Sequence, residues 1–302
     1  MTGAEEGIVL ERDGAEYRVA TAGGERRAVL RGRAKRDTPK VVVGDRVTLE
    51  PEAGGKLWGI TAIGERRTLL ERRVPEGRGT RPVAANIDEV FVVTAVADPP
   101  PIPQLLDRLL VVAEANGIPA AVVVNKTDIA DPAPLVTRFE RAGYTVFPTS
   151  ARTGAGMPRF VEALTGHIAV VTGPSGAGKS SLLNAVQPGL TLRVGAVSEK
   201  VRRGRHTTVG AVMIPLERGG YLVDTPGFSE VGLWGIEPRE LASCFPEMRE
   251  HIGACHFPDC RHVTEPKCAV RDAVARGTIA ADRLESYRVL LAELEAEPAE
   301  WE

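Results

Sequence analysis

The sequence runs Gly173-Pro174-Ser175-Gly176-Ala177-Gly178-Lys179-Ser180 directly after an apolar segment, 168–172, and directly before 181–186, which has the pattern of a helix start. A strand, a glycine-rich turn and a helix in this order are typical of the phosphate-binding loop G-x-x-x-x-G-K-[ST]. The glycines let backbone N–H groups turn toward phosphate oxygens, and the helix N-terminus adds a partial positive charge. A glycine-rich turn that matched the motif by chance would not need to lie between a strand and a helix. We therefore predict that the chain binds a nucleoside triphosphate.

Two side chains of this loop have expected chemical roles. Lys179 is predicted to reach the β- and γ-phosphates and to support catalysis there, and the Ser180 hydroxyl is predicted to bind Mg²⁺. Together with one glycine from a later motif, the predicted phosphate contacts are Gly173, Pro174, Ser175, Gly176, Ala177, Gly178, Lys179, Ser180, Ser181 and Gly227.

Two further motifs indicate which base is bound. N-K-x-D, the base-recognition motif of GTPases, follows the apolar segment 120–124, and T-S-A follows a predicted strand at 144–147. A carboxylate at Asp128 would accept hydrogen bonds from guanine N1–H and the exocyclic amine, a donor pair that adenine lacks. A backbone N–H of the T-S-A segment would lie near guanine O6. The predicted guanine contacts are Asn125, Lys126, Thr127, Asp128, Ser150 and Ala151.

A fourth motif, Asp224-Thr225-Pro226-Gly227, follows a predicted strand at 221–223 and fits D-x-x-G. The Asp224 carboxylate is expected to hold Mg²⁺ through water, and the Gly227 N–H to contact the γ-phosphate. Every one of the four motifs follows the carboxyl end of a predicted strand, which is the edge where open α/β sheets bind ligands. Jointly they predict a domain that binds GTP and GDP.

The order of these motifs is unusual. In common GTPases the phosphate loop precedes D-x-x-G and N-K-x-D, whereas here N-K-x-D and T-S-A come first. The set is a circular permutation, closed by the short connection 165–167 and opened after D-x-x-G. Termini that lie close together at a domain surface make such a permutation tolerable. Because strands and helices alternate from residue 89, we predict a permuted α/β GTPase domain with a mainly parallel sheet at 86–235.

The N-terminal part has a different pattern. Short apolar segments at 7–10, 17–20, 27–30, 41–49 and 58–63 are separated by glycine turns, which predicts an OB-fold β-barrel over 1–68. Such barrels bind nucleic acid or only pack against neighbouring domains. Basic residues on the third strand and after the fifth favour RNA. The Arg-, Gly- and Pro-rich segment 69–85 is interpreted as a linker.

The C-terminal part, 236–302, contains a compact set of metal-ligand residues. Three thiolates and one imidazole fall within 14 residues, at Cys255, Cys260, His262 and Cys268. This set predicts one tetrahedral, structural Zn²⁺ that stabilises a small α-helical domain. His251 and His256 are alternative ligands, although His256 directly follows a ligand cysteine. Cys244 is expected in the core.

Chain length, net charge and composition limit the number of domains and the kinds of partner. A chain of 302 residues suggests two or three domains, and a net charge of −2 excludes a global charge for binding polyanions. Basic residues gather at 26–36, 66–81 and 193–205, which raises RNA as a partner. The sequence has neither a run of 18 apolar residues nor an N-terminal signal pattern, so we expect a cytoplasmic protein without membrane contact.

The permuted order, the preceding barrel and the Cys/His cluster together resemble the ribosome small-subunit-dependent GTPase A family (RsgA, also called YjeQ), from about residue 7 to 294. The most specific pieces are Gly204-Arg205-His206-Thr207-Thr208, the D-T-P-G-F segment at 224–228 and the cysteine cluster. The resemblance implies an OB-fold, a permuted GTPase domain and a zinc domain. It also implies a bacterial factor that contacts rRNA late in maturation of the small ribosomal subunit, whose GTP hydrolysis that subunit stimulates. We expect a monomer.

The segment 190–208 has no clear period and is predicted to be a mobile loop that hydrolysis releases. Thr207 or Thr208 would join Ser180 and Asp224 at Mg²⁺. Many GTPases place a Gln after D-x-x-G to orient the attacking water, whereas this chain has Phe228. His206 is the candidate to replace it. The alternative is that His206 contacts RNA phosphate beside its neighbouring arginines; the resemblance favours the catalytic role.

A function from another class also fits the motifs: a non-ribosomal, nucleotide-responsive RNA- or protein-binding switch with only residual hydrolysis. Stimulation of hydrolysis by purified small subunits distinguishes the two hypotheses.

Overall fold

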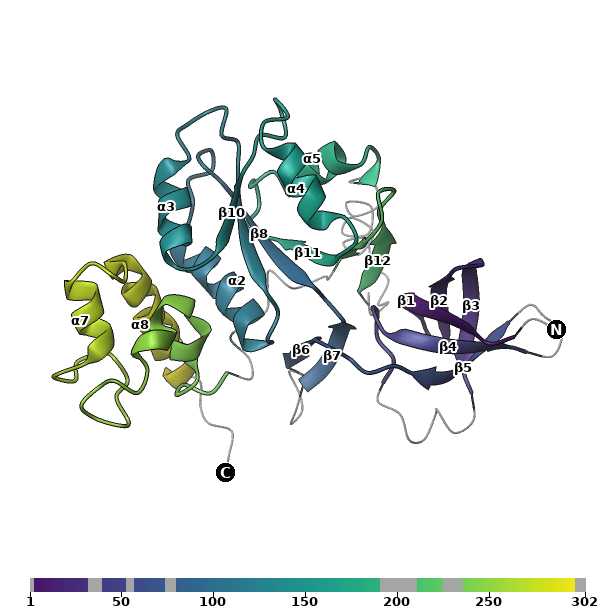
Figure 1. The fold of residues 1–302 in the computed structure, drawn as a ribbon, viewed down its shortest axis with the longest axis horizontal. Coiled ribbons are helices and arrows are strands. Elements are labelled where there is room, and N and C mark those ends of the chain that lie inside the picture. Colours follow the sequence, from purple (N-terminus) through teal and green to yellow (C-terminus); the bar gives the residue numbers. More distant parts are fainter. Residues whose placement is uncertain are drawn as a thin grey trace. The chain divides into compact units, whose positions relative to one another are not determined.

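A computed structural model describes residues 3–31, 40–52, 57–73, 80–190, 211–224, 233 and 236–296 (Figure 1). The chain forms two compact units. One contains Met1–Glu89, Val161–Val171 and Gln187–Phe228, and the other Val90–Phe160, Thr172–Val186 and Ser229–Glu302. The predicted His206, Thr207, Thr208 and Gly227 lie outside the described residues, as does the predicted mobile loop except for Leu190.

The first unit begins with a closed barrel whose strand order is β1-β2-β3-β5-β4. Its strands are β1 (Glu5–Asp13), β2 (Glu16–Thr21), β3 (Gly24–Leu30), β4 (Arg46–Pro51) and β5 (Trp58–Ile63). Neighbouring strands are antiparallel except for β3 and β5, which are parallel. Alternate residues such as Val9, Val19 and Leu49 are fully buried inside the barrel, as expected where one face of each strand lines the core. The predicted OB-fold barrel is confirmed.

The structure adds two details to the N-terminal prediction. The strand expected at 41–49 begins only at Arg46, because Asp45 makes a turn in which its carboxylate accepts the backbone N–H of Val42 at 2.8 Å. The segment expected as a linker forms the antiparallel hairpin β6 (Leu69–Arg73) and β7 (Thr80–Ala85). Because this sheet has only two strands, β7 is an edge strand. Pro82, which has no N–H to donate to a neighbouring strand, is therefore tolerated there.

The first unit also contains three strands of the α/β part. β11 (Ile168–Thr172) ends at the phosphate loop and runs parallel to β13 (Tyr221–Asp224), which pairs antiparallel with β12 (Val212–Pro215). The predicted strands at 168–172 and 221–223 are confirmed.

The second unit contains the parallel strand set β10-β9-β8, formed by β8 (Glu89–Ala95), β9 (Ala120–Asn125) and β10 (Thr145–Pro148). The helices that alternate with these strands are α2 (Pro103–Ala115), α3 (Ala133–Arg141), α4 (Met157–Leu164) and α5 (Lys179–Val186) (Figure 1). The rings of Phe91, Phe147 and Phe160 pack edge to face with centroids 5.4–6.1 Å apart. The predicted strand–helix alternation is confirmed.

The same unit ends in a helical module with η2 (Leu241–Cys244), η3 (Pro246–His251), α7 (Ala269–Ala275) and α8 (Ala281–Ala296). Its core includes Phe245, Met248 and Tyr287, and Val111 of α2 packs in the same cluster. Cys244 is buried there, as expected. The module therefore shares a hydrophobic core with α2, and is not held by a tether alone.

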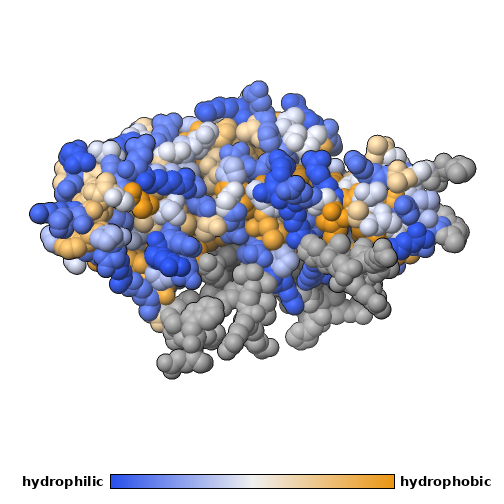
Figure 2. Space-filling model, turned by 60° about the horizontal axis from the view of Figure 1, so that its bottom comes forward, coloured by the Kyte–Doolittle hydropathy of each residue, from blue (hydrophilic) through white to orange (hydrophobic). Residues whose placement is uncertain are grey.

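The surface is largely polar. Figure 2 shows hydrophobic residues as small patches between hydrophilic ones on the face drawn. Among the described residues, the helices are all too short or too polar to cross a bilayer.

Candidate functional site

The phosphate loop is shaped by glycines that other residues could not replace. Gly173 has φ +141°, and a Cβ there would lie 2.1 Å from the carbonyl oxygen of Val93. Gly178 has φ +89°, and a Cβ there would lie 2.3 Å from Nδ2 of Asn125. Positive φ and close approach both favour glycine. The loop is thus packed tightly between the end of β8 and the N-K-x-D segment.

Lys179 begins α5 and turns back over the loop. Its Nζ donates to the carbonyl oxygens of Gly173 at 2.7 Å and Pro174 at 2.9 Å. Burial lowers the pKa of the Lys179 ammonium. A positive charge held at this loop, next to the N-terminus of α5, is the arrangement expected for binding phosphate.

Asn125 connects the three predicted nucleotide-binding segments of this unit. Its side chain is 1 % exposed, and its Nδ2 donates to the carbonyl oxygen of Ala177 in the phosphate loop at 3.1 Å. Its Oδ1 accepts the backbone N–H of Ala151 at 3.2 Å. Nearby, Lys126 donates from Nζ to the carbonyl oxygen of Asp98. Residues about 50 positions apart are thereby brought into one site.

Asp128 already has partners for both carboxylate oxygens. Ser150 donates from Oγ to Oδ1, and Arg152 donates from Nε to Oδ2 at 2.7 Å. The second guanidinium nitrogen of Arg152 lies 2.6 Å from the same Oδ2. The Ser150 hydroxyl and Arg152 lower the pKa of Asp128, so the group is a carboxylate at neutral pH. It is an acceptor of the kind that guanine's two donors require.

The structure brings the phosphate loop, N-K-x-D and T-S-A together within the second unit. Asp224 ends β13 in the first unit, where it is half-buried and pairs in register with Val212. Burial raises the pKa of Asp224. A cation beside this carboxylate would favour its charged form.

The predicted metal ligands form one cluster in the second unit. The Sγ atoms of Cys255, Cys260 and Cys268 and the Nδ1 of His262 all lie within 4.8 Å of one another. The Nδ1 is 3.4–3.6 Å from each sulfur, and the sulfurs of Cys255 and Cys268 are 3.9 Å apart. A tetrahedral site with Zn–S bonds of about 2.3 Å has ligand atoms roughly 3.6–3.8 Å apart.

The surroundings of the cluster also suit thiolate ligands. The backbone N–H of Ala269 donates to the Cys255 sulfur at 3.3 Å, and that of Arg271 to the Cys268 sulfur at 3.5 Å. Hydrogen bonds of this kind orient metal ligands and stabilise their charge. The four residues can therefore hold a metal ion, and they fit Zn²⁺ in donor type, number and spacing.

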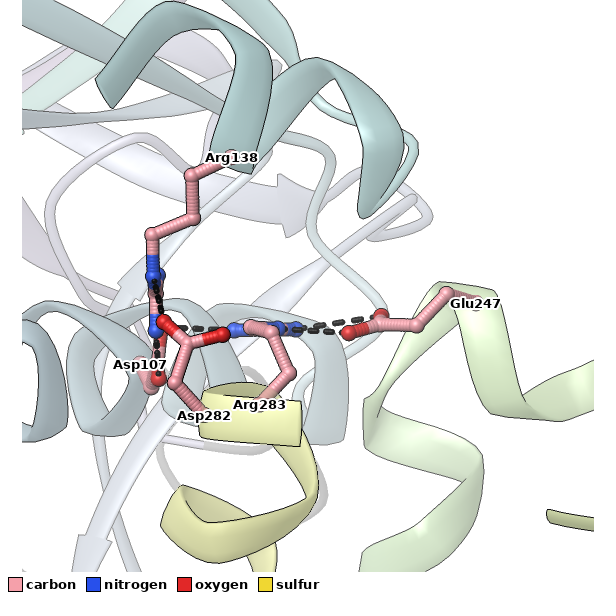
Figure 3. Close-up of polar contacts among 5 residues, drawn as sticks. All are labelled: Asp107, Arg138, Glu247, Asp282 and Arg283. Carbon is pink, nitrogen blue, oxygen red and sulfur yellow. Dashed lines mark hydrogen bonds and ion pairs between the residues drawn. The ribbon is translucent and has the colours of Figure 1, made fainter. Parts of the chain in front are cut away.

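A buried charge network joins the C-terminal module to helices α2 and α3, and the sequence did not reveal it. Arg138 of α3 donates two hydrogen bonds to Asp107 of α2, at 3.0 and 2.8 Å. Arg283 of α8 donates to the same carboxylate at 2.6 Å and to Glu247 of η3 at 2.5 and 3.1 Å. Figure 3 shows Arg283 lying between the two carboxylates, with Asp282 completing the group on Arg138.

This network lies in the interior. The side chains of Asp107 and Arg283 are 0 % and 1 % exposed, and that of Glu247 is 6 % exposed. Burial opposes ionisation of Asp107, but the two arginines outweigh it and hold the carboxyl pKa below its usual value. The sequence signal was an aspartate within the apolar stripe of α2, and its two arginine partners are 31 and 176 residues away.

Four of the described arginines of the barrel are paired with glutamates. Arg18 pairs with Glu11 and Glu25, Arg26 with Glu5, Arg27 with Glu16, and Arg31 with Glu50 and Glu52. The basic residues on β3 that favoured RNA are therefore partly neutralised within the barrel itself.

Known proteins with the same arrangement were found in three comparisons. A sequence model described as RsgA GTPase matches residues 63–234. A protein of Gemmatimonas aurantiaca named "Small ribosomal subunit biogenesis GTPase RsgA" is 49% identical and covers 97% of this chain and 99% of its own length. A protein of the same name from Moorella thermoacetica is 43% identical, covering 96% and 97%.

Two solved structures have the same fold over nearly the whole chain. The crystal structure of YjeQ from Thermotoga maritima superposes with a TM-score of 0.79 at 35% identity and covers 97% of this chain and 99% of its own. YloQ, described as a circularly permuted GTPase, has a TM-score of 0.77 at 27% identity and covers 97% and 96%.

Proposed function

Because this chain belongs to the RsgA GTPase family, we propose that it hydrolyses GTP to GDP and phosphate on the small ribosomal subunit, late in the biogenesis of that subunit. The observation that carries the proposal is the side chain of Asn125, which joins the phosphate loop to the T-S-A segment beside Asp128. These segments occur in permuted order along the chain. Phosphate and guanine contacts therefore meet in one place.

In this site the chain's own residues would bind and orient the nucleotide. Lys179 exchanges its two carbonyl partners for β- and γ-phosphate oxygens, and backbone N–H groups of the loop surround them. Asp128, Ser150 and Ala151 read the base. Ser180, Asp224 and one of Thr207 and Thr208 would hold Mg²⁺, which supplies charge neutralisation on the phosphates. Gly227 and the loop after residue 190 would sense the γ-phosphate.

The other parts of the chain would bind the small ribosomal subunit. We propose a division into an OB-fold barrel (1–68), a linker (69–85), a permuted GTPase domain (86–235) and a zinc-binding helical domain (236–302). The barrel and the zinc module are proposed to contact rRNA, and the protein to act in the cytoplasm as a monomer.

The deciding experiment compares GTP hydrolysis by the purified chain alone and with purified small or large ribosomal subunits. A many-fold rise with small subunits only supports the proposal. A rate indifferent to small subunits supports the alternative, a non-ribosomal nucleotide-responsive switch with residual hydrolysis.

The variant His206→Ala tests the proposed water-orienting residue. Phe228 follows D-x-x-G and has no hydrogen-bonding group, so intrinsic hydrolysis should be slow. We expect His206→Ala to bind GTP and the subunit normally and to lose about 100-fold in the stimulated rate, the lower end of what one positioned acid–base group provides. Single-turnover hydrolysis on saturating subunits measures this. Lost subunit binding with an unchanged rate per complex would instead assign His206 to an RNA contact.

The variant Cys260→Ser tests the structural role of zinc. Removal of one of four ligands should lower the zinc content from one ion per chain and loosen residues from about 237 onward, while nucleotide binding stays largely intact. Metal analysis and hydrogen exchange along the chain measure both effects. Cys244→Ser is the control, because Cys244 lies in the core outside the cluster. A metal-free wild-type chain, or loss of catalysis without local opening, would contradict the proposal.

A further inference from the structure

We propose that Arg152 competes with guanine for the carboxylate of Asp128, so that it weakens nucleotide binding and speeds nucleotide release. The inference rests on the proposed function, since it takes Asp128 as the residue that reads guanine. In the structure two nitrogens of the Arg152 guanidinium, Nε and one terminal nitrogen, lie 2.7 and 2.6 Å from one oxygen, Oδ2 of Asp128.

The hydrogen-bonding capacity of the carboxylate decides which partner has to leave. Guanine presents two donors, N1–H and the exocyclic amine, and needs one carboxylate oxygen for each. Oδ1 accepts one hydrogen bond from Ser150 and keeps a second lone pair. Oδ2 accepts a hydrogen bond from Nε of Arg152 and has a second nitrogen of the same guanidinium 2.6 Å away, so this oxygen is already occupied. Guanine can therefore bind beside Ser150 but has to displace Arg152.

The burial of the two partners agrees with this assignment. Ser150 is fully buried, and its hydroxyl oxygen also accepts the backbone N–H of Thr153 at 3.1 Å, so it is fixed in place. The Arg152 side chain is 72% exposed, whereas that of Asp128 is 10% exposed. Water can solvate the guanidinium when it leaves. Arg152 is thus the partner that can be exchanged, and Ser150 the one that stays.

Arg152 therefore acts as a competitor of guanine that is part of the chain itself. When the guanine donors separate from Oδ2, Arg152 re-forms its pair with the carboxylate and opposes rebinding. Exposed ion pairs are weak, so the effect on affinity should be roughly two- to five-fold. An adenine nucleotide lacks the donor pair, does not displace Arg152 and should be insensitive to it.

The test measures affinity and dissociation rate of fluorescently labelled GDP on the full-length chain. Arg152→Gln should bind GDP roughly two- to five-fold more tightly and release it more slowly, while Arg152→Lys stays near wild type. The difference should shrink at high salt, which screens the pair. Arg159→Gln is the matched control. It removes the same charge from an exposed position seven residues away, where the guanidinium lies over the Phe147 ring and not at Asp128.

Two results would overturn the inference. Equal GDP affinity for wild type and Arg152→Gln would show that Arg152 does not compete. Weaker binding by Arg152→Gln, with unchanged thermal unfolding, would show that Arg152 supports the base. Failure of the wild-type chain and of every variant to bind GDP would overturn the proposed function itself. That outcome differs from the two above, in which GDP still binds.

Discussion

Replacing Arg283 by Met should lower the free energy of local unfolding around α2 and α8 by about 3–5 kcal/mol, the cost of breaking a buried charge group on one side. The guanidinium bridges Asp107 and Glu247, and its removal leaves Glu247 without its partner and Asp107 with Arg138 alone. Hydrogen exchange of α2 and α8 peptides measures this local opening. A local measurement is needed because a chain with several cooperative parts has no single free energy of unfolding.

The control for this prediction is Arg276→Met, which removes an exposed charge after α7 in the same module. Acid should imitate the Arg283 variant. Because the folded-state pKa of Asp107 lies below its ordinary value of 3.8, the stability it contributes is present above that value and is lost as the pH falls further. If Arg283→Met and Arg276→Met open α2 equally, the network does not stabilise the module.

Asp128→Asn should reduce affinity for GTP by roughly 10⁴-fold, as expected for sites whose hydrogen-bond partner is left unmatched. The change puts an amide donor opposite a guanine donor. Xanthine carries a carbonyl oxygen in place of the exocyclic amine, so the amide can donate to it and still accept from N1–H. Affinity for xanthosine triphosphate should therefore rise. Competition binding with both nucleotides measures the exchange of preference.

Asp131→Asn provides the matched control, because it makes the same chemical change three residues further on. Asp131 accepts the backbone N–H of Ala133, the first residue of α3, and the side-chain oxygen of asparagine can accept the same hydrogen bond. GTP affinity should be unchanged in this variant. Unchanged GTP affinity in Asp128→Asn would remove the assignment of Asp128 to guanine.

The proposed nucleotide-binding segments and the Cys/His cluster could be predicted because each is a short local pattern at a strand end or turn. The strands and helices around them, such as α4 and β11, followed from periodicity. The hairpin β6–β7 was missed because its composition suggested a linker, while the pairing that orders it lies between residues such as Leu69 and Ala85. The strand expected at 41–49 started late because Asp45 closes a turn on Val42, in which Gly44 has φ +88°. That turn is also close to Ala85, since a Cβ at Gly44 would lie 2.0 Å from the Ala85 carbonyl oxygen.

Long-range polar pairing was the least predictable feature. Leu284, Tyr287 and Leu291 of α8 are buried, as the apolar spacing of this helix would suggest. Arg283, beside these residues, is equally buried, but only because a carboxylate from α2 and one from η3 meet it. A single sequence contains both charges without indicating that they are adjacent.

The ion pairs of the barrel influence how this surface would meet a polyanion. Four described arginines, Arg18, Arg26, Arg27 and Arg31, are matched by six glutamates. At distances beyond about one Debye length, roughly 8 Å in physiological salt, these paired charges largely cancel. These four arginines would therefore contribute less to electrostatic steering than the same number of unpaired arginines. The guanidinium groups would bind phosphates at short range. Because the glutamates hold these groups in fixed positions, they would favour a ligand whose phosphates have a matching spacing.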